Sequence, residues 1–150
     1  MDEEDPLTWE VEPYENFLDF HFLYRAVHKI LWRIWPDLNR IYPNFFTLDQ
    51  TINGLSFDWS KYATSKFTLN SRPEPELNVN GVVELNVGKV KSIIKNKSLP
   101  LTIRHNPIRE SPVNRAHTIL EGIGKINKAK IKIELSNIAN WAQNMKPIKQ

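Results

Sequence analysis

The hydrophobic positions in the first third of the chain predict one long helix, from about Tyr14 to Trp35. Apolar residues recur there at spacings of three and four, as on one face of a helix, at Phe20, Leu23, Val27, Ile30 and Ile34. Pro36 ends the pattern, because proline cannot continue a helix. Other sides of this helix are also apolar, so we expect it to be buried on most sides or to pair with another chain. The residues expected to contact a protein partner, or a second copy in a homodimer, are Phe20, Tyr24 and Trp32.

The stretch from Asp37 to Pro75 is rich in aromatic and turn-forming residues. We expect short strands or irregular segments beneath the aromatic rings, with a turn at Asn53 and Gly54. Two prolines favour an extended connection near its end, so residues 71–77 are a candidate boundary between subdomains. Residues 1–13 are acidic and also contain two prolines, which predicts a flexible lead-in.

Shorter elements follow in the second half of the chain. The apolar run Val82 to Leu85 predicts a strand, and Asn86 is placed to cap a helix from Val87 to Lys95. A second strand is expected from Leu101 to Arg104. Two strands around one helix are a candidate parallel βαβ unit, although the crossover is short for one.

Two further helices are predicted towards the C-terminus. A short one runs from Arg115 to Glu121 and stops at the glycines that follow. The last runs from Lys128 to Asn144, where apolar residues at helical spacing give one buried stripe. The whole pattern predicts a small single domain of the α+β class over residues 14–150, with an N-terminal aromatic helix, short strands and a C-terminal amphipathic helix.

Composition narrows the classes of protein. The chain has 150 residues, 41% hydrophobic and 25% charged, which suits one globular domain. No apolar run is long enough to span a membrane. The absence of cysteine excludes disulfides, thiolate nucleophiles and zinc–thiolate sites, and the acidic start argues against a signal peptide, so we expect a cytoplasmic protein. No glycine-rich phosphate loop or metal-binding spacing is present, and we expect no cofactor and no metal.

Charge is divided unevenly along the chain. Residues 1–70 carry 11 acids and 6 Lys or Arg, whereas residues 71–150 carry 6 acids and 14 Lys or Arg. A basic C-terminal half favours a polyanion such as the backbone of RNA or DNA. The binding residues expected are Arg104, Asn106, Asn114, Lys125, Lys128, Lys130 and Lys132. The alternative is that the basic surface meets the acidic half within one fold.

Residues 104–117 hold the densest set of chemical groups. This stretch contains three arginines and two histidines, expected in a loop between a strand and a helix. His105 and His117 could serve as base and acid in metal-free RNA cleavage, with Arg104, Arg109 and Arg115 holding the phosphate. The alternative is structural: His105 bonded to backbone at a strand end, and His117 packed on its helix.

Three segments carry a resemblance: His105-Asn106-Pro107-Ile108 with Asn114-Arg115-Ala116-His117, Asp58 to Tyr62, and Asn80 to Val83. Together they resemble a group of short, uncharacterised bacterial and archaeal proteins. The resemblance covers about the last two thirds of the chain and brings no activity with it. It implies that His105, Asn114 and His117 act together.

Two functions follow from these observations. The first is a small binding or accessory protein that contacts nucleic acid through its basic half and a protein through its N-terminal helix. The alternative is a metal-independent ribonuclease or other phosphoryl-transfer enzyme, of the toxin or defence type, that uses His105, His117, Arg109 and Arg115. The enzyme requires both imidazoles to face one cleft, within roughly 7 Å of each other.

Overall fold

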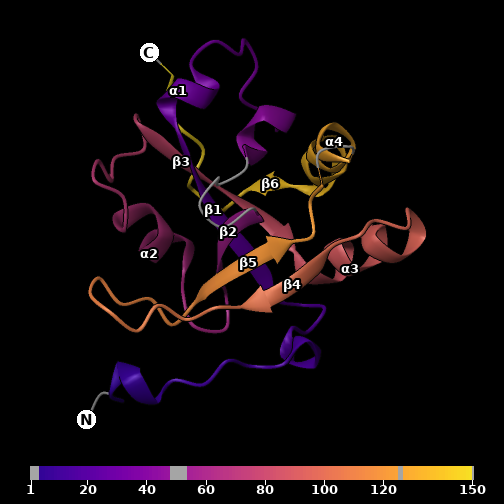
Figure 1. The fold of residues 1–150 in the computed structure, drawn as a ribbon. Helices are drawn as coiled ribbons and strands as arrows, with labels where there is room; N and C mark the ends of the chain where they lie inside the picture. The colour runs from indigo at the N-terminus through magenta and orange to yellow at the C-terminus, as the bar shows by residue number, and fades with distance from the viewer. Residues whose placement is uncertain (1–3, 48–53, 125–126, 150) are drawn as a thin grey trace.

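One antiparallel sheet organises the protein. The computed structural model describes residues 4–47, 54–124 and 127–149, and six strands in these ranges form the sheet (Figure 1). In chain order they are β1 (Phe22–His28), β2 (Gly54–Trp59), β3 (Asn80–Asn86), β4 (Thr102–His105), β5 (His117–Glu121) and β6 (Asn140–Trp141). Their spatial order is β4-β5-β2-β1-β3-β6, and every neighbouring pair is antiparallel. With the helices around it, the sheet confirms the α+β class.

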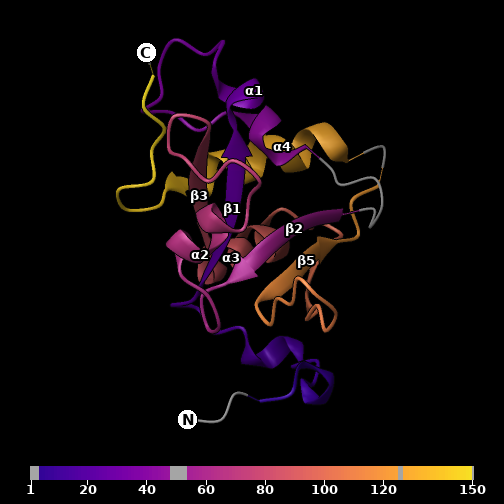
Figure 2. The ribbon, with the colours of Figure 1, turned by 90° about the vertical axis from the view of Figure 1, so that its left-hand side faces the viewer.

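Helices lie on both sides of this sheet. They are α1 (Lys29–Trp32), α2 (Ser65–Asn70), α3 (Val87–Asn96) and α4 (Lys128–Ile138), with short 3-10 turns η1 (Pro6–Thr8), η2 (Tyr14–Asn16) and η3 (Pro43–Phe46). Figure 1 shows α3 and α4 on one side of the sheet and α2 on the other, and Figure 2 views the α2 side. None of the helices in the described ranges is both long enough and apolar enough to cross a membrane.

Local signals placed two of these helices correctly. The side chain of Asn86 accepts a hydrogen bond from the Lys89 amide (3.0 Å), so α3 begins where its cap predicts. The C-terminal helix α4 also begins at the expected Lys128, but it ends at Ile138. Its end comes six residues before the predicted one because Ala139 takes an extended conformation and leads into β6.

The predicted N-terminal helix is wrong. Residues Phe22–His28 form β1, and only the four residues of α1 are helical beyond it. All seven residues of β1 pair with β3, and this non-local pairing overrides the helical spacing of the apolar positions. The helix proposed for protein association therefore does not exist: Phe20 is 72% exposed in a turn, Tyr24 lies on β1, and Trp32 is buried at 1% exposure.

The predicted helix over 115–121 and the parallel βαβ unit are also wrong. Residues His117–Glu121 form β5, which pairs with β4 as an antiparallel hairpin. Strands β3 and β4 are not neighbours, because β5, β2 and β1 lie between them. Residues 106–116 are therefore the loop of this hairpin.

The two faces of the sheet are filled unequally. On the α3–α4 side, a large core joins the strands to both helices, to η3 and to Phe17. On the α2 side, the buried cluster is small and consists of Leu69, Val82 and Ala142. The sheet therefore has one fully covered face and one that α2 covers only in part.

Strands β1 and β2 separate soon after they meet. They pair at Leu23 with Trp59 and at Tyr24 with Asp58. Beyond this point the Arg25 guanidinium occupies the gap and donates to the carbonyl oxygens of Ser56 (3.0 Å), Phe45 (3.1 Å) and Thr47 (2.7 Å). These bonds tie β1 to β2, to η3 and to the residue that follows η3. The candidate site described below lies at this split.

Candidate functional site

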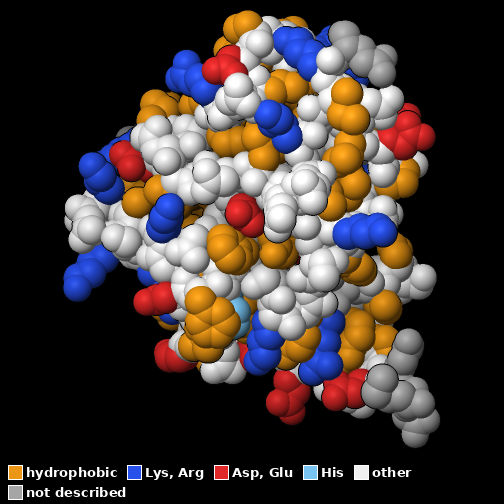
Figure 3. Space-filling view, turned by 180° about the vertical axis from the view of Figure 1, so that it is seen from behind, with side chains coloured by type: hydrophobic (Ala, Val, Ile, Leu, Met, Phe, Trp, Pro, Cys, Tyr) orange, Lys and Arg blue, Asp and Glu red, His pale blue; other side chains and the backbone are white. Residues whose placement is uncertain are grey.

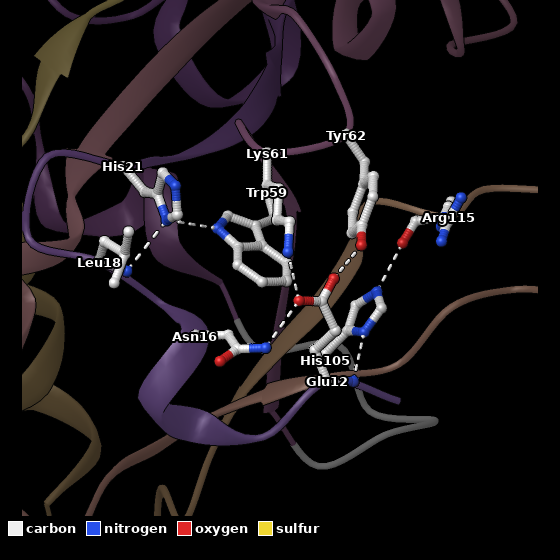
Figure 4. A network of polar contacts seen from close by, with 9 residues as sticks. All are labelled: Glu12, Asn16, Leu18, His21, Trp59, Lys61, Tyr62, His105 and Arg115. Carbon is white, nitrogen blue, oxygen red and sulfur yellow. Dashed lines mark hydrogen bonds and ion pairs between the residues drawn. The ribbon is translucent and has the colours of Figure 1, made fainter. Parts of the chain in front are cut away.

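His105 is a buried residue of the covered face. Its side chain is 0% exposed, beside the rings of Trp59 and Tyr62 (Figure 4). Nδ1 accepts a hydrogen bond from the Glu12 amide (3.0 Å), so the ring proton is on Nε2, which donates to the Arg115 carbonyl (2.6 Å). Burial lowers the pKa of His105, and the ring is held neutral. Both ring nitrogens are occupied, so His105 is structural.

The two histidines expected to act together face opposite sides of the sheet. His105 pairs with Thr118 across the β4–β5 hairpin, so these two side chains share a face. His117 is the residue before Thr118 and points the other way, because side chains alternate along a strand. The two imidazoles therefore cannot bracket one phosphate, and the predicted catalytic pair is not assembled.

The three arginines of the segment are engaged separately. Arg104 forms an ion pair with Glu121 (3.0 Å), and Arg109 donates twice to the carbonyl of Trp9 (2.9 and 2.7 Å). Arg115 bonds Glu4 (2.8 Å) and stacks over the ring of Tyr62. Arg109 and Arg115 thus hold the N-terminal segment rather than an external anion. The mobility predicted for residues 1–13 stays a prediction; residues 1–3 lie outside the described ranges.

The lysines expected to bind nucleic acid do not share one surface of α4. Lys128 and Lys132 are four residues apart and lie on one side of the helix, whereas Lys130 is about 200° around it from Lys128. Burial, and then the charge of Lys128, lower the pKa of Lys132. Lys125 lies outside the described residues. On the face seen in Figure 3, Lys and Arg side chains are dispersed among Asp, Glu and hydrophobic ones.

A polar hollow opens instead on the α2 side, at the split between β1 and β2. Its volume is about 170 Å³. It is lined by Tyr24 of β1, Ser56, Phe57 and Asp58 of β2, His117 of β5, and three residues from loops: Ser71, Arg72 and Asn114. Asn114 and His117, two of the residues expected to act together, therefore meet here, without His105.

Asp58 ties three elements together at the floor of this hollow. It is 7% exposed, and its two oxygens accept hydrogen bonds from Asn114 Nδ2 (2.8 Å) and Thr68 Oγ1 (2.7 Å). The other side-chain atom of Asn114, Oδ1, accepts from the Ala116 amide (3.0 Å). Strand β2, helix α2 and the 106–116 loop are thereby fixed to one another.

His117 is held in one tautomer by a backbone carbonyl. Its Nδ1 lies 2.8 Å from the Asn106 oxygen, which can only accept, so the proton is on Nδ1. The contact of Asn106 Nδ2 with the same atom is longer, at 3.4 Å, and brings two donors together, so we assign the bond to the carbonyl. Nε2 is then an acceptor, and the Ser56 hydroxyl donates to it (3.2 Å).

A second hollow, of about 360 Å³, adjoins the first. It lies over Ala26, whose short side chain leaves room above β1, and is bounded by His28, Pro73, Glu74 and Asn80. Arg72 lines both hollows, which we together name the Arg72 groove. The Arg72 residue is exposed, and its guanidinium has no hydrogen-bond or ion-pair partner within the described ranges.

Sequence reasoning missed Ser56, Asp58 and Arg72. The run Leu55-Ser56-Phe57-Asp58-Trp59 alternates strictly between apolar and polar residues, which is the signal of a half-buried strand with both polar residues on one face. That signal was available and would have placed Ser56 beside Asp58. Arg72 lies in an extended connection, and only the tertiary fold brings it over β1 and β2.

Comparisons with known proteins identify no relatives of this chain. Among the described residues, no group of three or more His, Asp or Glu side chains is arranged to hold a metal ion. We find no protein-family model that matches the chain, and neither a curated protein nor a solved structure matches it.

Proposed function

We propose that this protein binds a nucleotide, free or as part of a single-stranded nucleic acid, in the Arg72 groove. The observation that carries the proposal is the unengaged Arg72 guanidinium at the junction of two hollows lined by polar side chains. A guanidinium forms forked, charge-assisted hydrogen bonds with phosphate oxygens. The other arginines of the predicted site are already bonded to groups of the protein.

The two hollows of the Arg72 groove differ in character: the smaller is polar, and the larger has both apolar and polar lining residues. The smaller hollow offers the Tyr24 hydroxyl to a phosphate. Burial, and then the charge of Glu84, raise the pKa of Tyr24, so its hydroxyl keeps its proton. Both oxygens of Asp58 already accept hydrogen bonds, which offsets part of its negative charge.

The larger hollow suits a flat ring. Ala26 and Pro73 present apolar surface, while Glu74 and His28 supply polar groups at the margin. A base can lie on the apolar surface while its edge meets the polar groups, the arrangement used by proteins that take single bases. The size of the two hollows favours one nucleotide over a duplex. A chain without cysteine also fits the reducing cytoplasm, where we place the protein.

Calorimetric titration with adenosine 5′-monophosphate tests this function, with adenosine and inorganic phosphate as partial probes. We expect saturable binding that Arg72→Ala weakens more than about tenfold, because the forked phosphate contacts are lost. Ala26→Phe should weaken binding by filling the larger hollow.

Arg33→Ala is the matched control, since Arg33 is exposed just after α1 and lines neither hollow. It should bind as the wild type does. Binding that Arg72→Ala and Ala26→Phe leave unchanged, or no binding by the wild type, would overturn the proposal.

A further inference from the structure

We infer that Ser56 is a nucleophile activated by His117, and that the site hydrolyses a carboxylic ester of the ligand bound in the Arg72 groove. The identity of that ligand rests on the proposed function, whereas the reactivity of Ser56 does not. The observation is the chain of two hydrogen bonds described above, from the Ser56 hydroxyl to His117 Nε2 and from Nδ1 to the Asn106 carbonyl.

The tautomer is the one that a general base needs. Serine is a weak nucleophile until a neighbouring base removes its proton, and the base must present an unprotonated nitrogen to it. The Asn106 carbonyl fixes the proton on the far nitrogen, as an orienting third group does in serine hydrolases. His105 differs in that both its ring nitrogens bond backbone groups in the core, whereas His117 meets a serine hydroxyl in an open hollow.

Both partners stand on rigid elements. Ser56 lies in the middle of β2, and its carbonyl is held by Arg25 (3.0 Å). His117 begins β5, and its carbonyl accepts the Asn106 amide (2.8 Å), so the residue that orients the ring is itself fixed by the hairpin. Groups placed on strands keep catalytic geometry better than groups on free loops.

The groove supplies the remaining requirements. Ser56 and His117 both line the smaller hollow, so a reacting group can reach them. Arg72 lines the same hollow, so a ligand held by its guanidinium lies beside Ser56. The larger hollow then holds the part of the ligand that does not react.

The step balances without any co-reactant except water. The Ser56 proton moves to Nε2 as Oγ bonds to the ester carbon; the carbon–alkoxide bond then breaks, and the leaving oxygen takes that proton as an alcohol. Water next gives a proton to Nε2 as its oxygen bonds to the acyl carbon. The bond from Oγ to carbon breaks, Oγ regains the proton, and a carboxylic acid leaves.

A fluorophosphonate probe tests the reactivity directly, because an activated serine displaces fluoride from phosphorus and becomes stably labelled. We expect peptide mapping by mass spectrometry to find the label on Ser56 of the wild-type protein. Ser56→Ala should remove it, and His117→Gln should slow labelling by at least about tenfold through loss of the base. Ser136→Ala, a serine of α4 bonded only to its own helix, is the control and should label normally.

Each outcome separates the two proposals. No label on wild-type Ser56, or labelling that His117→Gln leaves at the wild-type rate, would overturn the inference while leaving nucleotide binding to its own test. A label on Ser56 in a protein that binds no adenosine 5′-monophosphate would support the hydrolase and reject the ligand.

Discussion

Replacing Glu12 by Gln gives the clearest quantitative test of how the N-terminal segment is held. The Glu12 carboxylate accepts hydrogen bonds from Lys61, Tyr62 and Asn16 (Figure 4). Burial alone would raise its pKa, but these hydrogen bonds and the charge of Lys61 outweigh burial and lower it from 4.5 to about 2. The carboxylate form is therefore much more stable in the folded protein than in the unfolded chain.

The pKa shift converts into a free energy of unfolding. A lowering of this size corresponds to about 3 kcal/mol at neutral pH, and the Glu12 side chain is only 13% exposed, so solvent screening removes a minor part. We expect Glu12→Gln to lower the free energy of unfolding by about 2 to 3 kcal/mol at pH 7. The pKa is lowered on folding, so this contribution is complete above 4.5 and is lost as the pH falls towards 2.

The assay is urea unfolding followed by tryptophan fluorescence. Between about pH 7 and pH 3, the difference between wild type and Glu12→Gln should shrink by about 2 kcal/mol, because Glu12 of the unfolded chain takes up a proton below pH 4.5 while the folded protein still holds it mostly as carboxylate. Glu10→Gln changes an exposed carboxylate two residues away and should cost less than about 0.5 kcal/mol. A Glu12→Gln deficit that is the same at both pH values, or equal to that of Glu10→Gln, would refute the electrostatic reasoning.

Three further predictions test other parts of the structure. Burial lowers the pKa of His105 below 6.5, so its contribution to stability is complete above pH 6.5 and is lost as the pH falls below that value. The melting temperature of His105→Gln should therefore fall less steeply than that of the wild type between pH 8 and pH 5. An equal slope in the two proteins would contradict the buried, neutral ring. Thr68→Val removes one donor to Asp58 and should cost about 1 to 3 kcal/mol in chemical unfolding, whereas Thr102→Val on the exposed part of β4 should cost little. Lys128, Lys130 and Lys132 changed together to Glu should leave nucleotide affinity in calorimetry within about threefold of wild type, and abolished binding would place the site on α4.

Elements with strong local signals were predictable from the sequence. Helix α3 has its capping Asn86 and helical spacing of apolar residues, and both act within a few residues of one another. The strand before it was predicted from its apolar run, and the start of α4 from apolar residues at helical spacing; both are also local signals. The first strand was not, because Phe20, Leu23, Val27, Ile30 and Ile34 fit helical spacing while pairing with β3, more than 50 residues away, decides the structure.

The site was predictable only in part, because strand register decides which side chains meet. Asn114 and His117 were chosen for their chemistry, and they do share a hollow. Shifting a strand by one residue moves every side chain to the other face, so the sequence could not say that His105 faces the core. Arg72 joins the site because the connecting segment that carries it passes over β1 and β2. The prolines predict that this segment is extended, but no local pattern says where it runs.

The most direct test of nucleotide binding in the Arg72 groove is a titration of ¹⁵N-labelled protein with adenosine 5′-monophosphate, followed by amide chemical shifts. Saturable changes should gather at residues 24–28, 56–58, 71–74 and 114–117, which are far apart in sequence and meet only around this groove. Changes centred on α4, or none at saturating nucleotide, would contradict the account.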